Sequence, residues 1–148
     1  DAGEREQQGD AGGDGRTDIA LWRESDGIWY RIDSSNGVFS AFQWGTSGDV
    51  PAPGDFDGDG RMDVAVFRPS SGIWYRRDSQ TGTFTATQWG ITGDIPVVGD
   101  YDGDSREDIG VWRPSSGIWY VQRSTNSSLL AVQWGLDGDV PLASVDTP

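Results

Sequence analysis

The sequence predicts an all-β fold built from three related four-stranded units. Three observations support this prediction. A pattern of Asp and Gly residues followed by an apolar segment recurs at Asp10, Asp55 and Asp100, at a spacing of 45 residues. Each copy divides into four short segments rich in β-branched and aromatic residues, separated by Gly, Asp, Ser and Pro. The spacing of apolar residues typical of an amphipathic helix is absent from the sequence.

The third copy shows the four segments most clearly. We expect strands there at residues 95–101, 108–112, 117–123 and 129–134. These strands carry large side chains on both faces, since Ile118 and Tyr120 alternate with Trp119. A sheet that is apolar on both faces has to be stacked between neighbouring sheets, and four strands in about 45 residues is the size of a propeller blade. The sequence therefore predicts stacked blades.

The repeat also predicts where each blade begins and ends. We expect a first blade at residues 9–49, a second at 50–94 and a third at 95–139. The initial strand of the second blade is expected at residues 50–56, but the matching residues 3–8 are charged and have no strand pattern. Residues 1–8 are therefore expected to be a polar segment, and the first blade to lack its initial strand. Residues 140–148 begin like an initial strand, with no blade after them.

Composition excludes several classes of function. The chain has 148 residues, no Cys, no His and a formal net charge of −13. Disulfides, thiolate metal sites and cysteine or histidine catalysis are therefore excluded. No basic patch is present, so nucleic-acid binding is not expected. No apolar run reaches the length of a membrane span, so we expect no membrane insertion, and hard cations are the natural partners of such an acidic chain.

The Asp-rich segment of the second copy has the spacing of a calcium loop. Asp55, Asp57, Asp59 and Asp63 stand at loop positions 1, 3, 5 and 9, and the carbonyl of Arg61 would be the ligand at position 7. Calcium takes six to eight oxygen ligands, and this spacing directs several carboxylates to one point. The third copy supplies the same set: Asp100, Asp102, Asp104, Arg106 and Asp108.

Two alternatives and one exception accompany the calcium interpretation. An EF-hand is excluded because position 12 is Val66 or Val111, inside a predicted strand, instead of Glu. Asp and Gly also form turns without a metal, but several carboxylates in nine residues repel one another without a cation. The first copy has Gly12 in place of one Asp, so weaker binding is expected there. Its remaining candidate ligands are Asp10, Asp14, Arg16 and Asp18.

These motifs together resemble the FG-GAP/VCBS repeat over nearly the whole chain. The resemblance rests on Asp-x-Asp-Gly-Asp-Gly-x-x-Asp before an apolar strand, followed by Arg-Pro-Ser-Ser-Gly-x-Trp-Tyr, Gln-Trp-Gly and Gly-Asp-x-Pro. It implies an integrin-like propeller blade with Ca²⁺ in the loop between its first and second strands, and a secreted or cell-surface location. It also implies rings of about seven blades, and three blades are too few to close a ring.

We therefore expect a non-catalytic, calcium-stabilised extracellular structural protein that assembles with itself. Residues 140–145 of one subunit would complete the first blade of a neighbour, which gives a ring or an open filament. One alternative is a lectin-like or adhesion module that binds glycans or surface proteins. Another is a fragment of a seven-bladed propeller. Glycoside hydrolysis needs a pair of carboxylates across a cleft, and nearly all the Asp clusters are already assigned to metal loops.

Arginine and aromatic residues also recur in every copy. They could line a groove for a sugar or a peptide, or they could pack one blade against the next. Repetition in every copy favours packing, because a scaffold must repeat whereas a binding site need not. The residues are Arg23, Arg68 and Arg113, with the pairs Trp29 and Tyr30, Trp74 and Tyr75, and Trp119 and Tyr120.

Overall fold

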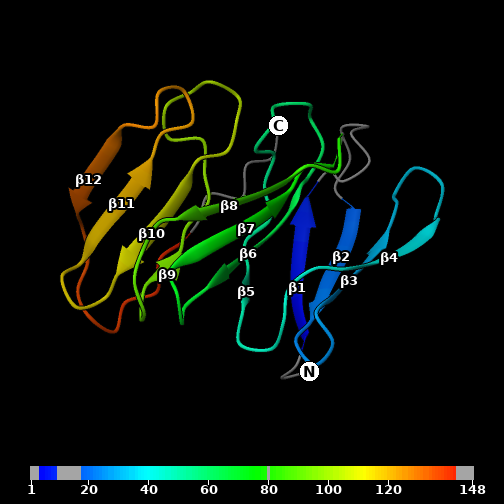
Figure 1. The fold of residues 1–148 in the computed structure, drawn as a ribbon, viewed down its shortest axis with the longest axis horizontal. Helices are drawn as coiled ribbons and strands as arrows, with labels where there is room; N and C mark the ends of the chain where they lie inside the picture. The colour runs from blue at the N-terminus through cyan, green and yellow to red at the C-terminus, as the bar shows by residue number, and fades with distance from the viewer. Residues whose placement is uncertain (1–3, 10–17, 80, 143–148) are drawn as a thin grey trace.

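Three antiparallel sheets of four strands each make up the computed structural model, which describes residues 4–9, 18–79 and 81–142 (Figure 1). The first sheet contains β1 (Glu4–Gly9), β2 (Asp18–Arg23), β3 (Ile28–Ile32) and β4 (Phe39–Gln43). The second contains β5 (Val50–Pro51), β6 (Val64–Arg68), β7 (Ile73–Arg77) and β8 (Phe84–Gln88). The third contains β9 (Ile95–Pro96), β10 (Ile109–Arg113), β11 (Ile118–Gln122) and β12 (Leu129–Gln133).

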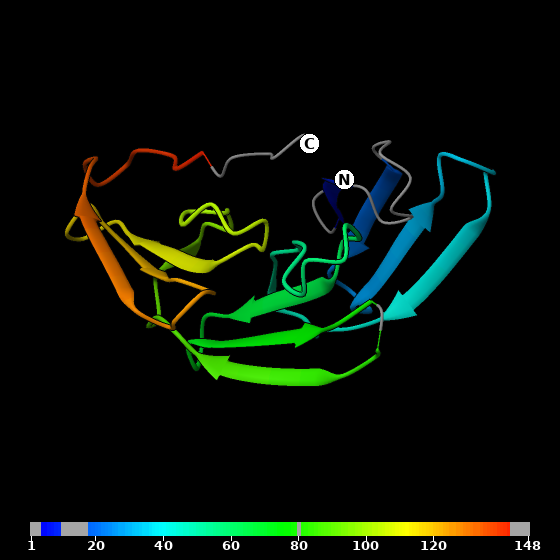
Figure 2. The same ribbon diagram turned by 90° about the horizontal axis from the view of Figure 1, so that it is seen from above.

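The strands of each sheet are neighbours in space in the order in which they occur along the chain. Such meanders need only short connections between consecutive antiparallel strands. The three sheets follow one another along an arc, with the first and third sheets at its two ends (Figure 2). The predicted all-β class and its three blade-like units are therefore confirmed.

The expectation that the first sheet lacks its initial strand is wrong. β1 pairs with β2 along six residues, from Glu4 opposite Arg23 to Gly9 opposite Asp18. The register follows the repeat, because Arg5 opposite Trp22 matches Val50 opposite Phe67, 45 residues further on. A backbone ladder needs only N–H and C=O groups, so this strand forms without the apolar alternation that predicts a strand from sequence.

The initial strands of the second and third sheets are shorter than expected. β5 ends at Pro51 and β9 at Pro96, and each is followed by an isolated bridge, at Gly54 in the second sheet and at Gly99 in the third. Proline has no backbone N–H to donate to a ladder, but hydrogen bonds between the strands continue past it, from the Ala52 N–H to the Ala65 carbonyl and from the Val97 N–H to the Gly110 carbonyl. Of the predicted strand after residue 139, residues 140–142 lie outside any strand, and residues 143–148 lie outside the described part of the chain.

The core lies between the sheets. Trp22 and Trp29 of the first sheet form one buried cluster with Val66 of the second. Phe67 and Trp74 of the second sheet pack in another cluster with Val111 of the third. Because each sheet contributes side chains to a cluster shared with the next, neighbouring blades are held together by burial of apolar surface.

Two polar contacts recur where one sheet passes to the next. The Trp44 indole Nε1 donates a hydrogen bond to the Tyr75 carbonyl at 3.0 Å, and Trp89 Nε1 donates to the Tyr120 carbonyl at the same distance. Asp49, just before β5, pairs with Arg68, and the corresponding Asp94 pairs with Arg113. The junction between the first two sheets is thus repeated between the second and third.

Candidate metal centre

The loop between β5 and β6 is closed by its own first aspartate. Asp55 Oδ1 accepts a hydrogen bond from the Gly58 backbone N–H at 2.8 Å, and Oδ2 accepts one from Gly60 N–H at 2.9 Å. Gly58 and Gly60 have φ angles of +79° and +82°, a left-handed conformation that favours glycine over residues with a Cβ. The alternation of Asp and Gly thus winds the backbone around the carboxylate of Asp55.

This winding brings three carboxylates of the loop together. One oxygen each from Asp55, Asp57 and Asp63 lie within 4.8 Å of one another, and the same holds for the third copy at Asp100, Asp102 and Asp108. Calcium binds oxygens at about 2.3–2.6 Å, so two ligands of one ion are separated by at most about 5 Å. Both clusters therefore have dimensions that fit a calcium ion bound by three carboxylates.

The second loop contains a carboxylate oxygen that the protein itself leaves without a partner. Asp57 Oδ2 is buried and accepts no hydrogen bond from the described residues. This burial raises the pKa of Asp57 to about 7 against the opposing hydrogen bond from the Asp59 backbone N–H, and the carboxylates of Asp55, Asp59 and Asp63 add to the increase. A buried carboxylate oxygen without a donor is costly, whereas a cation beside it would favour the charged form. The chemistry of this donor set thus suits a hard cation.

The ninth-position aspartates also have a structural role. Asp63 is fully buried, and its two oxygens accept hydrogen bonds from the backbone N–H groups of Phe56 and Ser79 at 2.9 and 2.7 Å. Asp108 accepts the equivalent bonds from Tyr101 and Ser124. Each of these carboxylates therefore ties the Asp-rich loop to the turn after the third strand of the same blade.

The fifth-position aspartates, Asp59 and Asp104, are not among the clustered carboxylates. Asp104 Oδ2 accepts hydrogen bonds from the Ser124 hydroxyl at 2.7 Å and the Thr125 hydroxyl at 3.0 Å. The Ser124 bond is the main reason why the pKa of Asp104 lies below its ordinary value. Asp59 Oδ2 lies 3.4 Å from the Ser79 hydroxyl. The side chains of Asp59 and Asp104 therefore point toward the turn after the third strand of their own blade.

The remaining predicted ligands are the carbonyl oxygens at loop position 7 and the candidate ligands of the first copy. The carbonyl oxygens of Arg61 and Arg106 stay predicted ligands at position 7. In the first copy, Asp10, Asp14 and Arg16 lie outside the described residues, whereas Asp18 is buried and accepts a hydrogen bond from the Ser34 N–H at 2.8 Å. Asp18 thus occupies the same structural position as Asp63 and Asp108.

Sequence reasoning missed the residues of the turn that meets each loop. Thr125 donates its hydroxyl proton to Asp102 Oδ2 at 2.7 Å and also contacts Asp104. Ser34, Ser79 and Ser124 each donate a backbone N–H to the ninth-position aspartate of their own blade. A usable signal existed, because these three serines recur at the 45-residue spacing.

The recurrent tryptophans and arginines are packing residues in the described junctions. Trp29 and Trp74 are buried, and their indole N–H groups donate to the carbonyls of Trp44 and Trp89. The Arg68 guanidinium lies 4.4 Å from the centre of the Tyr75 ring, a cation–π distance. Packing of one blade against the next is therefore confirmed for Trp29 and Trp74, which share buried clusters with Val66 and Val111 of the following blade, whereas Arg68 stacks within its own blade.

The FG-GAP-like repeat matches twice, at residues 10–66 and 55–111. The two matches overlap and together cover more than half of the 148 residues. The chain belongs to the FG-GAP-like repeat family. FG-GAP-like repeats are typical of extracellular, adhesion-type modules without enzymatic activity, and each match spans an Asp-rich loop with the sheet that follows it.

Other comparisons add no relative to this FG-GAP-like chain. No curated protein and no solved structure matched it. Among the described residues, no helix has the length and apolar character needed to cross a membrane.

Proposed function

We propose that this FG-GAP-like chain is a non-catalytic, calcium-stabilised extracellular module that assembles with itself. The buried Asp57 oxygen without a donor is the observation that carries the calcium part of the proposal. It lies in a cluster whose dimensions fit Ca²⁺, and the same cluster recurs 45 residues later. Clusters at the same three loop positions in two successive blades suit a structural role that every blade repeats.

The position of the loops explains how calcium would stabilise the fold. Each loop joins the first strand of a blade to the second, and its ninth-position aspartate is tied to the turn after the third strand. Neutralising the clustered carboxylates would remove their mutual repulsion within this loop. With free calcium at about ten times the dissociation constant, each site would stabilise the folded state by about 1.4 kcal/mol.

The loop of the second blade also contacts the third blade. The Asp55 carbonyl accepts a hydrogen bond from the Glu107 backbone N–H at 2.8 Å, and Glu107 lies in the calcium loop of the third blade. An ion bound at Asp55 would therefore hold one end of this inter-blade contact in place. Calcium would stabilise the junction between blades as well as each blade.

Thermal unfolding in calcium and in excess chelator tests this function. We expect wild type to melt at a higher temperature in calcium, and the double variant Asp57→Asn, Asp102→Asn to lose most of the difference. The matched control is Asp137→Asn, which removes one negative charge at an exposed residue outside both clusters. Equal melting temperatures of wild type in calcium and chelator would contradict the calcium role.

Self-assembly needs a different contact from the strand exchange predicted from the sequence. The edge of β2 at which a neighbour's residues 140–145 would pair is occupied by β1 of the same chain. A donated strand would have to displace a ladder of six residues. The faces of the first and third sheets are the remaining surfaces on which blades can stack, and we propose that assembly uses them.

A further inference from the structure

The contacts between the first and second blades show which side chains one blade packs against the next. At the first junction, the face of the first blade presents Trp29, Phe42 and Trp44. The second blade covers these rings: Val66 packs in a cluster with Trp29, the Arg77 guanidinium lies 4.2 Å from the Phe42 ring centre, and Phe84 meets Trp44 at 5.5 Å between ring centres.

The third blade presents the corresponding face without a covering blade among the described residues. Its Trp134, equivalent to Trp44 and Trp89, is 77% exposed, and Val132 of β12 is 47% exposed. The Trp134 indole N–H has no hydrogen-bond acceptor within the described part of the chain, whereas Trp44 and Trp89 both donate to a carbonyl of the following blade. The third blade therefore has the tryptophan indole N–H that would donate to a following blade, but no tyrosine carbonyl from such a blade accepts it among the described residues.

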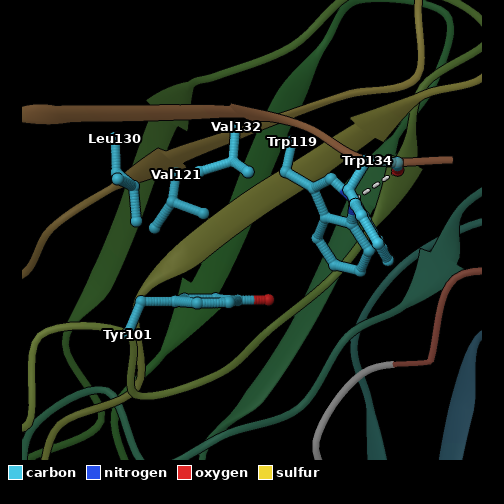
Figure 3. Close-up of a pocket in the computed structure, with 6 residues that line it drawn as sticks. All are labelled: Tyr101, Trp119, Val121, Leu130, Val132 and Trp134. Atoms are coloured by element: carbon cyan, nitrogen blue, oxygen red, sulfur yellow. Dashed lines mark hydrogen bonds between the residues drawn. The ribbon is translucent and has the colours of Figure 1, made fainter.

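This face is hollowed into an apolar pocket of about 240 Å³. The Trp119 and Trp134 rings lie at one end of it, Tyr101 forms one side, and the valine and leucine side chains lie at the other end (Figure 3). The hydrogen bond from Trp119 Nε1 to the Trp134 carbonyl, at 3.0 Å, fixes the two tryptophans relative to each other. Among the described residues, no polar side chain other than the tyrosine and the tryptophans lines the pocket, so it suits apolar side chains better than a sugar.

The first blade presents the opposite half of a junction at the other end of the arc. Phe39, equivalent to Phe84, is 63% exposed, and Ile19 and Ile32 are also exposed. Leu21 stands at the repeat position of Val66 and Val111. Tyr30 stands at the position of Tyr75 and Tyr120, whose carbonyls accept the tryptophan hydrogen bonds. Exposed apolar patches of this kind mark association surfaces.

We infer that the third-blade face of one copy binds the first-blade face of a second copy, head to tail. The inference rests on the self-assembly in the proposed function and names its contacts. Trp134 donates its indole N–H to the Tyr30 carbonyl of the second copy and packs on its Phe39, while Leu21 and Ile19 enter the apolar pocket. The occupant is a blade of the same repeat, because both internal junctions are built from these positions. A rotation that closes gives a ring, and one that does not gives a filament.

Sedimentation velocity in calcium, at about 0.15 M salt so that the acidic chains are screened, tests the inference. We expect wild type to associate and two variants, Trp134→Asp and Phe39→Asp, to be monomeric, each with association weakened on the order of tenfold or more. Each variant keeps one intact face, so an equimolar mixture should recover a dimer through a single junction. Ile91→Asp is the control, because Ile91 is exposed at the internal junction between the second and third blades.

Several results would overturn the inference. They are a monomeric wild type, association of either single variant at wild-type strength, or a mixture that stays monomeric. Substitutions at residues this exposed should leave the fold intact, and melting of each variant in calcium checks that it does. Since both variants keep the loops at Asp55 and Asp100, calcium stabilisation is measured on the same samples, and its failure is distinguishable from a failure of assembly.

Discussion

Arg68 donates two hydrogen bonds to Asp49, from Nε to Oδ1 at 2.7 Å and from Nη2 to Oδ2 at 2.9 Å. The Asp49 side chain is almost fully buried, whereas Arg68 is partly exposed. The same fork joins Arg113 to Asp94. This pair fixes the chain where it leaves one blade and enters the next.

Replacing Arg68 should destabilise the second blade, and replacement by alanine should cost more than replacement by lysine. Arg68→Lys keeps the charge but loses the two-pronged geometry, which should cost about 1–2 kcal/mol of unfolding free energy. Arg68→Ala leaves the Asp49 carboxylate buried without its arginine and should cost about 2–4 kcal/mol. Urea unfolding measures both, with Arg61→Ala as a control because the Arg61 side chain is exposed. Equal stability of the lysine variant and wild type would show that the fork geometry contributes nothing.

The tryptophan hydrogen bond between blades should matter only where a following blade is present. Trp89→Phe removes the donor to the Tyr120 carbonyl and should lower the unfolding free energy by about 1–2 kcal/mol. Trp134→Phe changes an exposed ring and should cost less than about 0.5 kcal/mol in the monomer. Urea unfolding of dilute samples compares the two, and similar losses would contradict the difference between the junctions.

Gly72 should tolerate no side chain. Its φ is +71°, and a Cβ there would overlap the Gly90 carbonyl oxygen. Gly93 has a φ of +93° but open space around the Cβ position. A side chain at Gly93 therefore adds backbone strain alone, whereas one at Gly72 adds steric overlap as well. Gly93→Ala should cost about 1–2 kcal/mol, and Gly72→Ala more than about 3 kcal/mol. Chemical denaturation measures both, and equal costs would show that the carbonyl moves freely.

The first calcium loop should be repaired by one substitution. Gly12 stands where the other loops have Asp57 and Asp102. Gly12→Asp should therefore add a calcium ion to the two expected at the Asp55 and Asp100 clusters. Isothermal titration calorimetry counts the ions bound per chain, with Gly12→Ala as the variant that adds no oxygen. An unchanged stoichiometry would mean that a missing third-position carboxylate is not what weakens this loop.

Much of the fold could be predicted because the three copies of the repeat show the same strand segments at the same spacing of 45 residues. Strands β10, β11 and β12 begin and end within a residue or two of the segments expected from the third copy. β1 was missed because its residues lack apolar alternation, and that pattern is produced by side-chain burial while the ladder is made by the backbone. Gly9 was the available signal, since it stands 45 residues before Gly54 and pairs with Asp18 as Gly54 pairs with Asp63.

The candidate site was predicted less completely than the fold. The spacing of Asp55, Asp57 and Asp63 was enough to place their oxygens together. It could not show that Asp59 turns toward Ser79, because that serine is 20 residues away in sequence and is brought near only by the hairpin of β6 and β7. Loop spacing describes local geometry, and the partners from other turns depend on how the sheet pairs.

The repeated contacts between blades bear on how the number of blades in such a chain can change in evolution. Trp44 and Trp89 make the same hydrogen bond at the same offset, and Asp49 and Asp94 make the same ion pair. Every 45-residue unit therefore carries the donor half of one junction and the acceptor half of another. An in-frame gene duplication of one unit would insert a blade whose two neighbours already recognise it, so the number of blades can change without any compensating mutation.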